Sequence, residues 1–246
     1  MAQPKTIYFG GAAFSCAYYI GVVKALRELY PEEIPTIHAD SAGSLVALAY
    51  ALDVPLTDMR DILYEVIRRS TGNRWGNGNV LHMALETAIE NMVTKGDFRR
   101  IQHNAKFNVG VTSFFNQYHV HSHWKSVDQL KRIMHKSMTI PFLSKTEYSL
   151  ELDGAFGNPC IGYDLTVGTT PEFDISLPLS WGMKMKVPTI DAANALVDRG
   201  ELDTKATMKL QRRGKKILVP SSNMVLAFMW ILKIMSVVAK WVGLSD

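Results

Sequence analysis

The sequence predicts an α/β fold in which a mostly parallel central sheet lies between layers of helices. Two observations carry this prediction: short apolar runs of strand length alternate with stretches of helical periodicity, and turns of small residues join them. The chain has 246 residues, of which 47% are hydrophobic and 20% are charged, so it is long enough to bury one full core. We therefore expect one main domain with helices on both faces of its sheet.

Two strand–turn–helix units open the chain. Residues 7–9 are apolar and enter a turn of glycine and alanine, after which apolar residues at helical spacing continue to Leu29. Residues 36–39 run in the same way through the turn DSAGS at residues 40–44 into an apolar helix over residues 45–52. Two such units in succession are typical of a parallel sheet.

The rest of the chain continues the alternation. Residues 70–79 (STGNRWGNGN) contain three glycines and three asparagines, which favour a mobile surface loop. The other predicted elements are helices at residues 55–69, 80–93, 126–138 and 191–213, strands at residues 105–112, 117–123 and 148–152, and edge strands at residues 162–167 and 183–187.

The positive charge gathers at the end of the chain. Residues 1–203 hold 19 lysines and arginines against 22 acids, whereas residues 204–246 hold eight against one, for a formal net charge of +4. A mildly acidic body argues against a nucleic-acid footprint, so we expect no nucleic-acid partner. With two cysteines and no apolar leader before the first strand, we expect an intracellular protein in a reducing compartment.

A basic cluster is followed by an apolar segment. Residues 205–216 contain six lysines and arginines and no acid, which is typical of attraction to anionic lipid. Residues 224–244 would extend about 31 Å as a helix, enough to cross a bilayer core. Lys233, Ser236 and Lys240 fall on one stripe of that helix, which favours a helix lying in the membrane interface. The alternative is a helix packed on the domain with a solvated basic face.

Ser41 is the candidate nucleophile. It lies between a predicted strand and a predicted helix, which is the context of a nucleophile elbow that exposes a serine hydroxyl. Such a turn needs small residues two positions before and after the serine, and Ala39 and Gly43 provide them. The other interpretation of these residues is that Ser41 simply caps the helix that follows.

Two further segments complete a candidate site. Gly11, Ala12 and Ala13 follow the first strand, where closely spaced amides at a helix N-terminus are able to hold a developing oxyanion. Asp153 ends a predicted strand, so its carboxyl is a candidate base for a serine nucleophile. The glycine patterns of phosphate and dinucleotide binding are missing here, which argues against a nucleotide function.

In order and placement these segments resemble the patatin-like family of lipid acyl hydrolases. The resemblance covers roughly residues 5–200 and is carried by residues 10–26 (GGAAFSCAYYIGVVKAL), residues 39–46 (ADSAGSLV), the stretch 126–143 and Asp153-Gly154-Ala155. It implies a three-layer α/β/α fold, with Ser41 as nucleophile and Asp153 as the base of a Ser–Asp dyad. It also implies an oxyanion hole at Gly11, Ala12 and Ala13, and it requires neither a metal nor an organic cofactor.

We therefore expect a membrane-associated lipid acyl hydrolase, of phospholipase A or lipase type, that cleaves carboxylic esters of membrane or neutral lipids. Residues 1–203 would form the hydrolase domain, and residues 204–246 the basic segment and apolar helix that reach the lipid surface, peripherally or as a single C-terminal anchor. No required protein partner is inferred. The alternative is a catalytically degenerate lipid-binding or scaffolding protein of the same fold, because Ala12, Ala13 and Ala39 replace glycines of the family pattern.

Two other sites are weaker hypotheses. The usual α/β-hydrolase triad runs in the order serine, acid, histidine, but all seven histidines precede Asp153. A triad such as Ser41, Asp97 and His119 remains open, although no motif supports it. His119, His121 and His123 alternate along a predicted strand at a spacing that could bind a metal, yet we expect a solvated strand face and no metal site.

Overall fold

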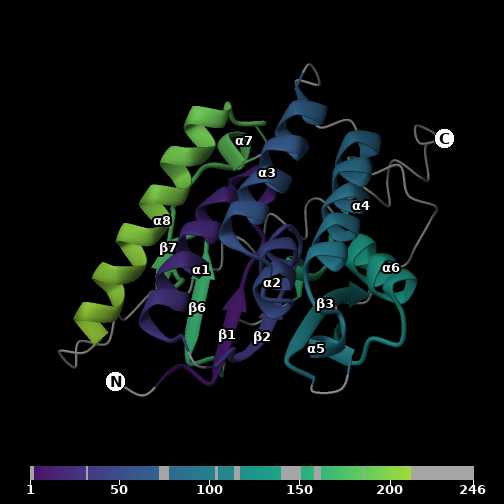
Figure 1. Ribbon diagram of the computed structural model, residues 1–246, viewed down its shortest axis with the longest axis horizontal. Coiled ribbons are helices and arrows are strands. Elements are labelled where there is room, and N and C mark those ends of the chain that lie inside the picture. The colour runs from purple at the N-terminus through teal and green to yellow at the C-terminus, as the bar shows by residue number, and fades with distance from the viewer. Residues whose placement is uncertain are drawn as a thin grey trace.

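The computed structural model describes residues 3–31, 33–71, 78–102, 105–113, 117–139, 151–157, 162–184 and 186–211. Its strands are β1 (Thr6–Phe9), β2 (Thr36–Ala39), β3 (Phe107–Ser113), β4 (Tyr118–His121), β5 (Glu151–Asp153), β6 (Leu165–Gly168) and β7 (Ile175–Ser176). They form one sheet in the order β4-β3-β2-β1-β6-β7, and β5 also pairs with β3. Only β4 and β5 run antiparallel to their neighbour. The expected α/β class with a mostly parallel central sheet is confirmed (Figure 1).

The two units at the start of the chain form as the sequence predicts. β1 leads through the 3-10 turn η1 (Ala13–Cys16) into α1 (Ala17–Leu29), and β2 leads into α2 (Gly43–Ala51). The two strands lie side by side in parallel, with Phe9 opposite Ala39, so the turns that follow them meet at the same end of the sheet. In α/β folds this carboxyl end of the strands is where ligands bind.

The middle of the chain follows the predicted elements to within a few residues. It contains α3 (Leu56–Ser70), α4 (Gly78–Lys95), a short α5 (Arg99–Gln102) that the sequence analysis does not anticipate, and α6 (Val127–Ser137). The predicted loop at residues 70–79 is shorter than expected, because Ser70 ends α3 and Gly78 begins α4. Residues 72–77 lie outside the described residues. The Ser126 hydroxyl caps α6 by accepting a hydrogen bond from the Gln129 amide at 3.2 Å.

The prediction for residues 162–187 is wrong in two respects. β6 is an interior strand rather than an edge strand, since it pairs with β1 on one side and β7 on the other, and its four residues are all buried. Met183 and Lys184 belong to the helix α7 (Trp181–Lys184), and the described residues near them form no strand. Met183 is 61% exposed, as expected for a residue on the outer side of a surface helix.

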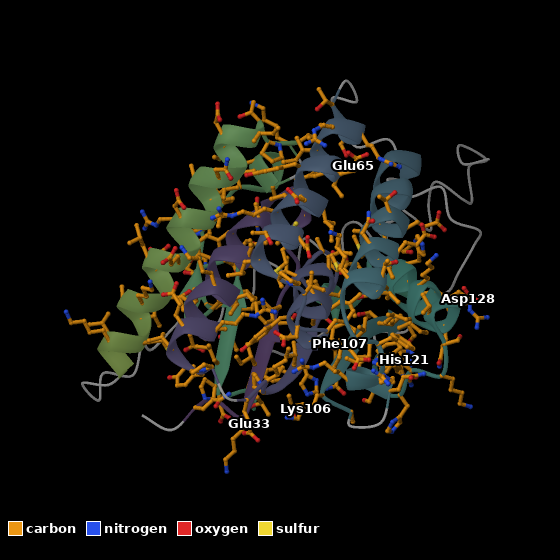
Figure 2. The ribbon with its side chains drawn as sticks, in the orientation of Figure 1. Glu33, Glu65, Lys106, Phe107, His121 and Asp128 are labelled. Atoms are coloured by element: carbon orange, nitrogen blue, oxygen red, sulfur yellow. The ribbon has the colours of Figure 1, made fainter. Side chains whose placement is uncertain are left out.

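The two faces of the sheet differ in chemistry. One face is apolar and lies in the core, where Phe9 contacts Tyr19 of α1 and Phe107 contacts Trp124, both with ring centroids 5.7 Å apart. Figure 2 shows Phe107 inside the molecule, with Lys106 close to the end of the sheet where the parallel strands begin. The buried strand residues of this face are Ile7, Phe9, Ile37, Ala39, Phe107, Val109, Val111, Leu165 and Val167.

The opposite face carries polar and aromatic side chains. Tyr8 stacks on Tyr163 and on Phe173, with ring centroids 5.1 Å and 6.0 Å apart. His38 of β2 also contacts Tyr163, at 5.1 Å between ring centroids, and burial lowers the pKa of this histidine. Aromatic side chains therefore cover this face of β1 and β2.

Helix α8 (Ile190–Gln211) lies along α1 (Figure 1). The two helices approach closely because glycines face the contact: a Cβ on Gly21 would lie 1.8 Å from the carbonyl oxygen of Val197, and one on Gly200 would lie 2.0 Å from that of Tyr18. The helix continues past residue 203 and buries Met208. The boundary expected between residues 203 and 204 therefore falls inside an element packed on the domain.

The end of the chain bears on the expected membrane contact. Lys205, a member of the basic cluster, makes ion pairs at 2.6 Å with both Glu28 and Glu201, so its charge is already compensated. Residues 212–246, which include the apolar segment 224–244, lie outside the described residues. Within the described part of the chain, none of the helices has both the length and the apolarity needed to cross a membrane.

Candidate active site

Ser41 lies on a strained turn between β2 and α2. Its φ of +53° is in the left-handed region, which costs a residue other than glycine about 1–3 kcal/mol and is common at functional turns. Gly43 makes the turn compatible with β1, because a Cβ there would lie 2.3 Å from the carbonyl oxygen of Gly10. Ala39 is fully buried beside Phe9, so the small residues sit where backbones crowd.

Several hydrogen bonds hold this turn. The Ser41 amide donates to the hydroxyl of Ser137, at the end of α6, over 3.0 Å. The Ser41 carbonyl accepts from the Ser44 hydroxyl at 2.6 Å, and the Asp40 amide donates to the carbonyl of Phe9 at 3.0 Å. The turn that carries Ser41 is thus tied to α2, α6 and β1, and none of these bonds uses the Ser41 hydroxyl.

The side chain of Asp153 meets that hydroxyl. Asp153 ends β5, opposite Val111 of β3, and is 4% exposed. Its carboxyl accepts a hydrogen bond from the Ala155 amide at 2.9 Å, and the Ser41 side chain lies within hydrogen-bonding reach of it. Burial is the main cause that raises the pKa of Asp153 to about 7; the nearby charge of Asp40 adds to this rise, and hydrogen bonding with Ser41 and the Ala155 amide opposes it. A carboxyl with such a pKa is suited to accept and return a proton near neutral pH.

The turn after β1 borders Ser41 and the turn that follows Asp153. A Cβ built on Gly11 would lie 3.0 Å from the Cβ of Ala155 and 3.8 Å from the Ser41 hydroxyl oxygen, so the Gly11 backbone lies against Ser41 and Ala155. The carbonyl of Gly11 accepts from Thr169 at 3.1 Å, and that of Gly10 accepts from Tyr19 at 3.1 Å. These bonds orient the peptide planes of the turn.

The two alanines of this turn differ in conformation. Ala12 has a φ of −132°, which any residue adopts, whereas Ala13 has a φ of +47°, where glycine is preferred. Ala12 is buried at 1% exposure and its carbonyl accepts from the Ser15 amide at 3.0 Å. The turn forms with alanine at both positions, but Ala13 holds it under strain.

The residues of the other two hypotheses, the Ser41–Asp97–His119 triad and the histidine metal site, do not form sites of this kind in the described structure. Asp97 is engaged on the surface with Arg99, at 2.9 Å between Oδ1 and Nε, and His119 lies exposed on the strand β4. The structure places Asp153, not this pair, beside Ser41. His119 and His121 share a face of β4, but among the described residues no group of three or more metal-binding side chains gathers.

Some residues of the site are missed by the sequence analysis. Ser137 is fully buried and anchors the nucleophile turn. The sequence signal for this role is that Ser137 lies on the same buried stripe of α6 as Leu130, Ile133 and Met134, where a serine needs a polar partner. Tyr8 and Tyr118 reach the carboxyl of Asp40 from two different strands. Strand residues that contact a turn side chain give no local sequence signal.

A serine on a strand-to-helix turn at the carboxyl end of a mostly parallel sheet is the arrangement of α/β serine hydrolases. Comparison with family models agrees, since residues 7–161 match the model of the patatin-like phospholipases. This is more than half of the chain, so the chain belongs to the patatin-like phospholipase family, as the resemblance indicated. Membership implies a lipid acyl hydrolase. Comparison with curated proteins gives no match.

Proposed function

We propose that the protein hydrolyses carboxylic esters of lipids with Ser41 as nucleophile and Asp153 as base. The observation that carries the proposal is the place of a strained, elbow-like serine within hydrogen-bonding reach of a buried carboxyl whose pKa lies at about 7. The dyad needs no metal or organic cofactor for this chemistry.

The proposed reaction has two halves. Asp153 takes the proton of the Ser41 hydroxyl while its oxygen attacks the ester carbonyl, and the amides of residues 11–13 hold the oxyanion that forms. The C–O bond to the alcohol then breaks, and Asp153 returns the proton to the leaving oxygen. In the second half Asp153 takes a proton from a water molecule, whose oxygen attacks the acyl carbon of the acyl-enzyme. The bond from that carbon to the Ser41 oxygen then breaks, Asp153 returns the proton to the Ser41 oxygen, and the fatty acid leaves.

Labelling with a serine-directed fluorophosphonate tests the nucleophile. We expect the wild type to be labelled and to hydrolyse short-chain esters, and both signals to be lost in Ser41→Ala and Asp153→Asn. Ser126→Ala is the matched serine control, because Ser126 caps α6 on the surface. Asp97→Asn and His119→Ala test the rival triad, and loss of labelling in these two would contradict the assignment of Asp153.

The second candidate is a lipid-binding protein of the same fold that does not hydrolyse the lipid it binds. The observation that favours it is the strained Ala13, whose side chain occupies a turn in which the family pattern has glycine. A folded wild type that binds lipid, is not labelled and gains labelling in Ala13→Gly would establish this candidate and overturn the first.

A lipid substrate requires contact with a lipid surface. We assign this contact to the tail, residues 204–246, which holds the basic cluster and the apolar segment. The proposal rests on the residues alone, six bases in 205–216 followed by an apolar segment, of which Lys205 is already paired. Deletion of residues 217–246 removes the apolar segment and keeps the basic cluster, so sedimentation with anionic vesicles should weaken strongly while fluorophosphonate labelling in detergent persists. Unchanged sedimentation of the truncated protein would refute the role of the tail.

A further inference from the structure

Asp40 is a buried carboxyl that the proposed reaction does not use. It directly precedes Ser41 and is fully buried, a costly place for an acid without partners. Two phenols supply them: the hydroxyl of Tyr8 donates to Oδ2 at 2.6 Å, and that of Tyr118 donates to Oδ1 at 2.9 Å. Because Tyr8 is in β1 and Tyr118 is in β4, this one carboxyl links the centre of the sheet to its edge.

Two glycines make the space that Asp40 occupies. A Cβ on Gly110 of β3 would lie 2.2 Å from Oδ1 of Asp40, and a Cβ on Gly154 would lie 2.7 Å from the same atom. Gly154 directly follows Asp153. The side chain of Asp40 therefore packs against the backbone that carries the base, while its own backbone carries the nucleophile.

We propose that Asp40 is a positioning residue that holds the Ser41 turn and the Asp153 turn in register, through its hydrogen bonds from Tyr8 and Tyr118 and its contact with Gly154. This inference rests on the proposed function, since Ser41 and Asp153 are the pair that it positions. Its electrostatic effect is consistent, because the charge of Asp40 raises the pKa of Asp153. Among the described residues, Tyr8, Tyr118 and Asp153 are titratable groups that face Asp40.

Variants of this cluster test the geometric part. We expect fluorophosphonate labelling to slow by about 100-fold in Asp40→Ala, the scale of a misplacement of about 1 Å, and by about tenfold in the more conservative Tyr118→Phe. Tyr18→Phe is the matched control. It also removes a phenol–carboxylate hydrogen bond, the one to Asp203 at 3.0 Å, but in the contact of α1 with α8. It should be labelled at the wild-type rate.

A titration that needs no turnover tests the coupling to the base. The Asp153 carboxyl is followed by carbon NMR in the wild type and in Asp40→Asn, which keeps the shape and removes the charge, with Asp153→Asn to assign the signal. We expect a lower pKa of Asp153 in Asp40→Asn. An Asp40 whose charge is not felt at the base would leave this pKa unchanged.

The two measurements separate the two proposals. A labelled wild type, together with wild-type labelling of Asp40→Ala and Tyr118→Phe and an unmoved Asp153 titration, would overturn the role of Asp40. An unlabelled wild type would overturn the proposed hydrolysis instead. In that event the titration decides the role of Asp40: a lower pKa of Asp153 in Asp40→Asn supports it, and an unchanged one refutes it.

Discussion

At the scale of single residues, the protonation of Asp153 is the most consequential property of the site. Its pKa of about 7 arises mainly from burial, which disfavours the carboxylate. As a base, Asp153 acts only when it has lost its proton. Ester hydrolysis should therefore rise with pH through about 7 and level off above it, as a pH profile of kcat/KM for a short-chain ester would show. A profile flat between pH 5 and 8 would contradict Asp153 as the base.

The same pKa has a consequence for stability. In the folded state Asp153 keeps its proton to higher pH than in the unfolded chain, so stability falls as pH rises from about 4 to about 7. Asp153→Asn removes this loss. Relative to the wild type, the variant should gain up to about 4 kcal/mol in the free energy of unfolding at pH 8 and much less at pH 4. Urea unfolding at both pH values measures this, and a difference independent of pH would contradict it.

The two alanines of the turn after β1 give opposite expectations for stability. Ala13→Gly relieves a φ of +47°, whose strain of about 1–2 kcal/mol exceeds the added flexibility of the unfolded chain, so the variant should be more stable by up to about 1 kcal/mol. Ala12→Gly relieves no such strain and should be less stable by about 0.5–1 kcal/mol. Thermal unfolding of both variants compares them directly. Equal shifts of the same sign would show that the two positions do not differ.

At the scale of elements, α6 is joined to the nucleophile turn by one hydrogen bond. Ser137→Ala leaves the buried Ser41 amide without its acceptor and should cost about 1–3 kcal/mol in the free energy of unfolding while slowing fluorophosphonate labelling. Ser126→Ala removes the cap of the same helix and should cost about 1 kcal/mol with labelling unchanged. Unfolding and labelling measured on both variants distinguish a general weakening of α6 from the loss of its hydrogen bond to the Ser41 turn. Wild-type labelling of Ser137→Ala would show that the turn holds without α6.

At the scale of the whole molecule, α8 is part of the folded body. A chain ending at residue 203 loses Met208, which is 2% exposed, and the ion pair of Lys205 with Glu28. Relative to a chain ending at residue 211, it should be less stable by about 2 kcal/mol or more, mostly from lost apolar burial. Urea unfolding of the two truncated chains tests this. Equal stability would place the end of the domain at residue 203 after all.

The local sequence predicts the elements around the site because each is specified by its own residues. The apolar runs at 7–9 and 36–39 and the small residues of DSAGS are sufficient for two strands and an elbow-like turn, and the structure has both strands and that turn. The prediction is wrong for residues 183 and 184, because so short an alternation of apolar and charged residues fits the end of a helix as well as a strand. The interior place of β6 is likewise decided by its neighbours, which no local pattern encodes.

By itself, the sequence determined the class of fold, the family resemblance and the candidate residues Ser41 and Asp153, since these depend on periodicity, turn chemistry and the order of short motifs. Only the tertiary structure decided which carboxyl meets the serine, the raised pKa of Asp153, the strain at Ala13 and the anchoring by Ser137, Tyr8 and Tyr118. The physical reason is that hydrogen bonding and desolvation at this site arise between segments up to 158 residues apart, and become defined only when the sheet brings those segments to one end.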